Sequence, residues 1–441
     1  MFERGTPNIV IALCVAASLL ASGLSAVNAG DPSLEAPVQA AQAEGSQDAG
    51  TAPPGQIVVD PDRPQWLMRK DVGPFFMCGP GDPEDFLYRG VLRPDGTRQG
   101  DQLALIDKLK GTGANSIYLM AVRSHGGDGD STHNPFIDHD PSGEINNRIL
   151  DQWETWFREM DRHGIVIFFF IYDDSARIWD TGDRVNKEER RFLRTLVDRF
   201  EHHRHLIWVV AEEYEERYSA ARVSRIAAEI RAADDFDHPI AVHKLPGLGF
   251  AEFANDPNID QFAIQYAAPN PEGLQAATAR MWRQARGRYN LNLAETHPTA
   301  QGRLVRLRNW AVAMGGAYSM VLGMDIANTP KSDLEDCGRL VGFMEATNFN
   351  EMAPRDDLAY AGTRYVLAKP RDSYIAYAPS GSERIGLRRM RTGRYDFTWF
   401  DPVTGTRIEW SDVDVASGSQ SWPKPEEIGE EVAVYVRLSG T

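Results

Sequence analysis

Residues 165–172 read IVIFFFIY, and residues 206–210 read LIWVV. Apolar runs this continuous are typical of strands that are covered on both faces, as in a parallel sheet. Comparable short runs recur from residue 74 to residue 349, and stretches with helical spacing of apolar residues separate them. This alternation predicts a series of βα units.

The order of these units predicts a closed barrel. The eight predicted strands are Pro74–Cys78, Ser116–Val122, Val166–Tyr172, Ile207–Ala211, Ile240–His243, Phe262–Tyr266, Asn290–Ala294 and Tyr318–Gly323. The predicted helices are Gln102–Lys110, Leu150–Arg162, Glu188–Glu201, Ala220–Ala233, Leu274–Arg286 and Arg303–Met314. Such a chain suits a (β/α)8 TIM barrel, for which ~250 residues is typical. An open doubly wound sheet is disfavoured, because residues 79–85, GPGDPED, do not form the glycine-rich phosphate loop it needs.

The rhythm changes after about residue 355. Short β-rich runs follow, among them DSYIAYA at 372–378 and RYDFTWF at 394–400, with the turn signal DPVTGT at 401–406. We therefore predict a barrel domain over residues 61–353 and a small antiparallel β-sandwich over residues 354–441.

The N-terminal region predicts export. Arg4 precedes an apolar run from Ile9 to Leu24, and small residues follow up to Ala29. This pattern predicts a signal peptide over residues 1–29 and a secreted or periplasmic protein, with an uncleaved membrane anchor as the alternative. Residues 30–60, poor in aromatic side chains, are expected to form a disordered linker.

Charge and cysteine usage narrow the function further. The formal net charge is -16 with no basic block, which argues against a nucleic-acid partner. Beyond the apolar run, Cys78 and Cys337 either pair or form two separate buried thiols, and we favour the separate thiols. The sequence predicts no metal and no cofactor, and it carries no signal for an oligomeric state.

Polar side chains gather where the predicted strands end. In a TIM barrel the carboxyl ends of the strands carry the active site. Those positions hold Asp82, Arg123, His125, Asp173, Glu212, Glu213, His243, Tyr266, Glu295, His297 and Asp325. A mouth this rich in carboxylates suits acetal hydrolysis, in which one acid protonates the leaving oxygen and a carboxylate meets the sugar carbon.

Two segments carry a family resemblance. Residues 206–216, LIWVVAEEYEE, and residues 289–299, YNLNLAETHPT, resemble strands four and seven of the retaining (β/α)8 glycoside hydrolases. With GPFFMCGPGDPEDF at 73–86 and RYDFTWFDPVTGTR at 394–407, the chain resembles the apiosidase-like hydrolases. These join such a barrel to a C-terminal β-sandwich of the type described as collagen-binding.

The resemblance implies roles for particular residues. Glu213 matches the acid/base and Glu295 the nucleophile, on opposite sides of the barrel. Tyr266 matches an aromatic residue that hydrogen-bonds the nucleophile, and Asp82 a ligand of a substrate hydroxyl. Strand alternation places Glu213 on the inward face with Ala211.

Two positions depart from the family pattern. Glu212 stands where the clan carries an Asn that holds a sugar hydroxyl, which leaves Glu212 as a rival acid. The strand-eight Trp is missing, and Asp325 follows that strand instead. The remaining candidates for substrate contacts are Arg123, His125, Asp173, His243 and His297.

Three polar segments have a second interpretation. Asp173 and Asp174 are either substrate ligands or a helix N-cap, and one residue in each role is favoured. The histidines and aspartates of residues 125–139 suggest a metal, but a polar loop over the mouth is favoured. Residues 199–206, RFEHHRHL, are interpreted as a solvated helix end that faces away from the mouth.

We predict a retaining glycosidase acting on a polysaccharide or oligosaccharide. One alternative is a carbohydrate-binding protein on a barrel that has lost catalysis, as the replaced Asn and missing Trp suggest. Another is a surface adhesin in which the β domain binds a polymer and the barrel serves as a scaffold.

Overall fold

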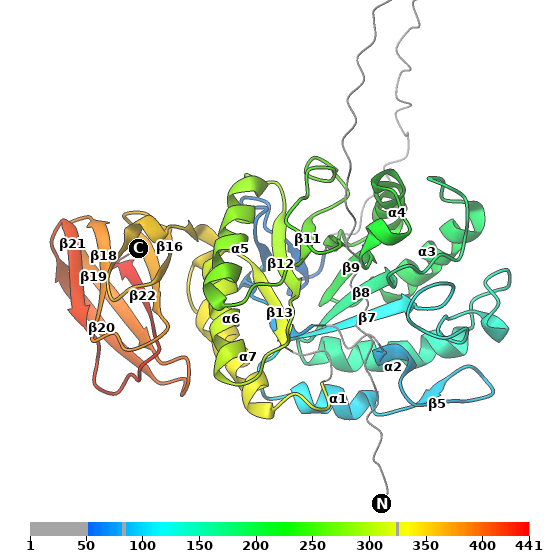
Figure 1. Cartoon of the computed structure of the whole chain (residues 1–441), viewed down its shortest axis with the longest axis horizontal. Coiled ribbons are helices and arrows are strands. Elements are labelled where there is room, and N and C mark those ends of the chain that lie inside the picture. Colours follow the sequence, from blue (N-terminus) through cyan, green and yellow to red (C-terminus); the bar gives the residue numbers. More distant parts are fainter. Residues whose placement is uncertain (1–51, 82–84, 323–325, 441) are drawn as a thin grey trace, which may run out of the picture. The chain divides into compact units, whose positions relative to one another are not determined.

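The computed structural model describes residues 52–81, 85–322 and 326–440. Its central feature is a sheet of eight parallel strands in the order β4-β13-β12-β11-β10-β9-β8-β7 (Figure 1). The strands are β4 Cys78–Pro80, β7 Ser116–Val122, β8 Val166–Tyr172, β9 Leu206–Ala211, β10 Ile240–His243, β11 Gln261–Gln265, β12 Asn290–Glu295 and β13 Tyr318–Leu322. The predicted TIM-barrel fold is confirmed.

Asn115 closes the sheet between its first and last strands. Its backbone N–H donates to the carbonyl of Cys78 at 3.0 Å, and its side-chain oxygen accepts the N–H of Cys78 at 2.9 Å. Among the described residues, β4 and β7 stand at the two ends of the strand order and do not pair as neighbouring strands. The Asn115 side chain therefore supplies one of the hydrogen bonds that join them.

Helices cover the outside of the barrel. They are α1 Gln102–Leu109, α2 Asn147–Arg162, α3 Lys187–Phe200, α4 Ala220–Ala233, α5 Pro271–Ala285, α6 Arg303–Met314 and α7 Lys331–Met344. Side chains of Asn146, Asn186 and Ser219 cap the N-termini of α2, α3 and α4. Gly164, at φ 68°, provides the left-handed residue between α2 and β8. No helix among the described residues has the length and apolarity to cross a membrane.

The first barrel strand begins later than predicted. Residues Gly73–Pro74 form β3, which pairs with β2 Leu67–Arg69 in a separate three-stranded sheet. Phe75 and Phe76 pack against Tyr318 instead of joining the barrel ladder. Their apolar side chains belong to the core, but not to a strand of the barrel.

The linker predicted over residues 30–60 is wrong at its C-terminal end. Ile57–Val59 form β1, which pairs with β2, and Ile57 is fully buried. The Ile57 amide also donates to the carbonyl of Arg204 at 2.8 Å. The predicted signal peptide, residues 1–29, lies outside the described residues.

Cys78 and Cys337 form a disulfide across 259 residues of sequence, so the preference for separate thiols is wrong. Cys78 begins β4, and Cys337 lies in α7, a helix that the sequence analysis did not predict. The bond therefore ties the first barrel strand to the helix that follows the last one.

The C-terminal residues form two antiparallel sheets, as predicted. One has the order β14-β16-β17-β22-β19-β20 and the other β15-β18-β21. Their strands are β14 Ala353–Pro354, β15 Ala359–Ala361, β16 Tyr365–Lys369, β17 Ser373–Ala378, β18 Arg384–Met390, β19 Gly393–Phe400, β20 Arg407–Val415, β21 Gly418–Pro423 and β22 Val432–Leu438. A short hairpin, β5 Val91–Leu92 with β6 Arg98–Gln99, precedes α1.

Aromatic contacts join the β domain to the barrel. Trp310 of α6 stacks on Tyr377 at a centroid distance of 4.8 Å, and Phe343 of α7 stacks on Phe400 at 4.9 Å. Arg306 of α6 binds Glu431 at 2.8 Å beside these rings. The two domains thus share one buried core.

Candidate active site

Glu212 and Glu213 directly follow β9 at the carboxyl end of the barrel. The Glu212 amide donates to the carbonyl of Tyr172 at 3.0 Å and so continues the pairing with β8. Glu213 then takes a left-handed conformation, with φ 33°, and begins the 3-10 turn Tyr214–Glu216. Since Glu213 lies beyond the strand, alternation does not govern its direction, and both glutamates approach the mouth.

His243, at the end of β10, is fully buried between these glutamates and Glu295. Its Nδ1 accepts the backbone N–H of Glu213 at 3.2 Å, so the neutral ring carries its proton on Nε2. Burial lowers the pKa of His243 to about 3. Its Nε2 lies 3.8 Å from Glu295 Oε2 and has no hydrogen-bond partner within the described part of the chain.

Glu295 ends β12 and faces the same space. Its Oε1 lies 2.5 Å from Nε2 of His297, a residue whose side chain is 52% exposed. One oxygen each of Glu212 and Glu295 and one ring nitrogen of His243 lie within 4.8 Å of one another. Carboxylates from β9 and β12 therefore converge on one buried imidazole.

Glu212 is held by a buried polar network. The Tyr118 hydroxyl of β7 donates to Glu212 Oε1 at 2.5 Å, and Glu212 also hydrogen-bonds Asp173. Burial raises the pKa of Asp173, whereas Arg123, at 2.8 Å, and the contact with Glu212 oppose the rise.

Glu213 has the environment of a general acid. The pKa of Glu213 is raised to about 7. The main cause is its partial burial, and electrostatic repulsion from Glu295 and Glu216 adds to the rise. The Gln265 side chain hydrogen-bonds Glu213 and opposes this rise. Glu213 can therefore hold a proton near neutral pH, as an acid/base residue must.

The remaining predicted residues are placed differently around the mouth. Arg123 is buried and pairs with Asp85 and Asp173, so its guanidinium supports the site from within the protein. His125 is exposed, and its ring contacts Ser124 at 2.7 Å. Tyr266 reaches Glu295 through a backbone hydrogen bond of 3.1 Å from its N–H, rather than through its hydroxyl. Asp82 and Asp325 lie outside the described residues.

The helix-cap interpretation of Asp173 and Asp174 is wrong. The residue that caps α3 is Asn186, whereas Asp173 accepts the amides of Asp128 and Asp174 in a turn. Burial and the neighbouring Asp173 raise the pKa of Asp174 to about 7.

Tyr118 and Gln265 are site residues that were not predicted from the sequence. Tyr118 lies inside an apolar run, and Gln265 directly precedes Tyr266. Each is a polar residue within or at the end of a predicted strand, and this was the available signal for a site residue. Whether such a side chain points into the barrel depends on the strand register.

The cluster of Glu212, His243 and Glu295 has metal-ligand side chains but does not suit a metal. The Nδ1 lone pair of His243 accepts the Glu213 amide, so Nε2 carries a proton and has no lone pair for an ion. The arrangement instead places a buried N–H donor beside the carboxyl groups of Glu212 and Glu295.

Comparisons with known proteins bear on the family and the fold. Residues 101–302 match the family model described as the apiosidase-like catalytic domain. The resemblance predicted from the sequence is confirmed. No curated protein matches the chain.

Solved structures extend the likeness over the described domains. One is a glycoside hydrolase with 14% sequence identity and a TM-score of 0.61. The match covers 88% of this chain and 98% of the chain of that hydrolase. A glycoside hydrolase family 5 structure from Bacteroides vulgatus ATCC 8482 has 14% identity and a TM-score of 0.61, covering 88% and 93%. At this identity the likeness establishes the fold.

Proposed function

We propose that this protein is a secreted or periplasmic glycosidase that cleaves a polysaccharide or oligosaccharide by double displacement. The observation that carries the proposal is the pair of unlike carboxyl groups at one mouth. Glu213 has a pKa of about 7, whereas Glu295 contacts His297 and lies near the buried His243. Carboxyl groups in such different environments can divide the roles of acid and nucleophile.

In the first step, Glu295 attacks the anomeric carbon, and Glu213 donates its proton to the departing oxygen. The sugar is then bonded to Glu295, and Glu213 is ionised. In the second step, Glu213 takes a proton from water as that water attacks the same carbon and releases Glu295. The electrostatic repulsion between Glu213 and Glu295 is relieved while Glu295 is bonded to the sugar, so the pKa of Glu213 is expected to fall as the base role begins.

Glu212 and His243 have supporting roles in this proposal. Glu212, held by the Tyr118 hydroxyl, places its carboxyl group beside His243 and Glu295. The Nε2–H of the buried His243 faces Glu295 at 3.8 Å and is available to its carboxyl group during the reaction.

A panel of plant and microbial polysaccharides tests the proposal through release of reducing sugar. We expect hydrolysis of at least one member by the wild type and its loss in Glu295→Gln. Glu212→Gln, from the neighbouring carboxyl, serves as the comparison and should retain more activity. Full activity of Glu295→Gln would overturn the assignment of the nucleophile.

A carbohydrate-binding protein without catalysis is the second candidate. It is favoured by Glu212, an acidic residue where the resemblance implies an Asn, and by the bond of Glu212 to Asp173. Retention of a polysaccharide without hydrolysis, equal in the wild type and in Glu295→Gln, would support this candidate.

The disulfide supports export of the protein, because such bonds persist in oxidising compartments. The shared aromatic core supports a bracing role for the β domain over an independent adhesin. Fractionation of cells that express the full chain, with a blot of each fraction, tests the location.

A further inference from the structure

A second cluster of chemically active side chains lies away from the barrel mouth. It consists of Glu154 in α2 and of His202 and His203 in the loop between α3 and β9. This loop leads into the N-terminal end of β9, so the cluster is at the opposite end of the strand from Glu212. The interpretation as a solvated helix end is wrong for His203, whose side chain is only 2% exposed.

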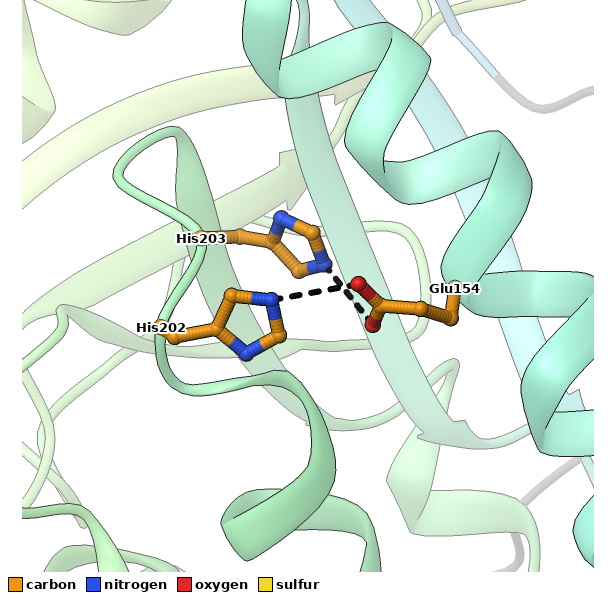
Figure 2. A group of neighbouring side chains, drawn as sticks. All are labelled: Glu154, His202 and His203. Carbon is orange, nitrogen blue, oxygen red and sulfur yellow. Dashed lines mark hydrogen bonds and ion pairs between the residues drawn. The ribbon is translucent and has the colours of Figure 1, made fainter.

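Both imidazoles point toward the same carboxylate (Figure 2). His202 Nε2 lies 3.2 Å from Glu154 Oε1, and His203 Nε2 lies 3.3 Å from Glu154 Oε2. One oxygen and the two nitrogens lie within 4.8 Å of one another. In a tetrahedral zinc site with bonds of about 2.0–2.1 Å, neighbouring ligand atoms are roughly 3.3 Å apart. The three groups are therefore close enough for small side-chain movements to bring one oxygen and both nitrogens around a single ion.

Surrounding contacts fix the cluster in place. His238, held by Asp234, has its Nε2 3.0 Å from the carbonyl oxygen of His203 and orients the loop. The His203 ring packs against Phe157 and Phe200. The Glu154 side chain is 8% exposed, whereas His202 is 53% exposed and leaves a path for an ion and for a water ligand. A buried, oriented carboxylate with two imidazoles needs little rearrangement to bind a metal.

Two arginines compete for the same carboxylate. Arg158 lies 3.0 Å from Glu154 Oε1, but its side chain is 69% exposed and can turn into solvent at small cost. Arg199 is farther from Glu154, at 4.0 Å, and binds Asp151 at 2.7 Å. Arg199 therefore has a second partner in Asp151, and Arg158 can be solvated when it leaves Glu154.

We propose that Glu154, His202 and His203 bind one divalent transition-metal ion of the zinc type, which fastens α2 to the loop before β9. Two imidazoles and one carboxylate suit zinc, and a water molecule completes the tetrahedron. Without the ion, each Nε2–H donates to the Glu154 carboxylate, which can only accept. Binding the ion requires each ring to take the tautomer with its proton on Nδ1, so that Nε2 offers its lone pair to the metal. The site is independent of the proposed hydrolase activity, because none of its residues reaches the mouth.

Zinc titration of the chelator-treated full-length protein tests the proposal. We expect saturable binding of one zinc ion per chain by calorimetry and a higher melting temperature with zinc. Cobalt should give the visible absorption of a tetrahedral ion. No saturable binding at micromolar zinc would overturn the proposal.

Variants separate this site from chance chelation by two adjacent histidines. Glu154→Gln and His202→Ala should each weaken zinc binding at least tenfold, the loss of one ligand's contribution. His163→Ala is the matched control, since His163 pairs with a single carboxylate, Glu159, at 3.0 Å on the same helix. That control should bind zinc like the wild type. Unchanged affinity in Glu154→Gln would overturn the proposal, even if the histidines still chelate.

Arg158→Ala gives a test in the opposite direction. Removal of the competing guanidinium should tighten zinc binding roughly two- to fivefold, the worth of one exposed ion pair. Weaker binding would show that the arginine supports the cluster rather than competing with the ion, and would contradict the proposed exchange.

Discussion

The backbone amide of Glu213 donates a 3.2 Å hydrogen bond to Nδ1 of His243. This bond fixes the tautomer of a fully buried ring and directs its Nε2–H toward Glu295, 3.8 Å away. The left-handed backbone at Glu213 makes the amide available, because the chain leaves the β9 ladder at this residue. One contact therefore couples the candidate acid to the surroundings of the candidate nucleophile.

The raised pKa of Glu213 predicts the pH dependence of hydrolysis. The protonated acid is the active form, so kcat/KM should fall as pH rises through about 7. Glu213→Gln should lose this basic limb and most activity toward substrates with poor leaving groups. Added azide should restore part of the activity of Glu213→Ala on an aryl glycoside, with retention of configuration. A basic limb that persists in Glu213→Gln would contradict the assignment.

Substitution of Gln265 should shift the basic limb of the pH profile of kcat/KM without changing a carboxyl group. Its hydrogen bond lowers the pKa of Glu213, so Gln265→Leu should shift the basic limb of kcat/KM to higher pH. The matched control is Gln261→Leu in the same strand, because Gln261 bonds Asn290 at 2.6 Å instead. A pH profile displaced equally in both variants would indicate a general loss of structure.

The buried His243 predicts an acid-labile fold. Its pKa is about 3 in the folded protein and ~6.5 in the unfolded chain, so between these values only the unfolded state binds the proton. The free energy of unfolding should therefore decrease as pH falls from 6.5 to 3, by roughly 3–5 kcal/mol at most. His243→Phe should remove this contribution, as measured by urea unfolding at pH 7 and pH 4. An identical decrease in the free energy of unfolding between pH 7 and pH 4 in the wild type and the variant would argue against this role of His243.

The disulfide should contribute strongly to stability. Loss of a native disulfide typically costs about 2–5 kcal/mol, and this one closes a loop of 259 residues. Dithiothreitol should therefore lower the melting temperature of the wild type. The double variant Cys78→Ala/Cys337→Ala should melt at a lower temperature and not respond to the reductant. A wild type insensitive to complete reduction would contradict this expectation.

Periodicity predicted the barrel where apolar runs are unbroken. The bounds of β7, β8, β10, α4 and α6 match the prediction. The first strand was displaced because Phe75 and Phe76 look like strand residues but pack against Tyr318. The closing contact of Asn115 and the disulfide depend on three-dimensional proximity, which periodicity does not encode.

The strand-end rule brought together Glu212, Glu213, His243 and Glu295. It could not predict which side chains point inward, since Tyr118 and Gln265 contribute through strand register. It also gave no signal for the cluster at Glu154, whose residues come from α2 and from the loop between α3 and β9, at the other end of the barrel. Their convergence depends on how α2 packs beside the loop before β9.

The Cys78–Cys337 bond also bears on what happens when the chain is cut. A protease that nicks a surface loop between these residues produces two fragments that stay covalently attached. Each keeps some barrel strands, and the fragments cannot diffuse apart until a reductant acts. If the protein is exported as proposed, a molecule nicked by an extracellular protease remains one particle whose pieces stay close enough to fold together again.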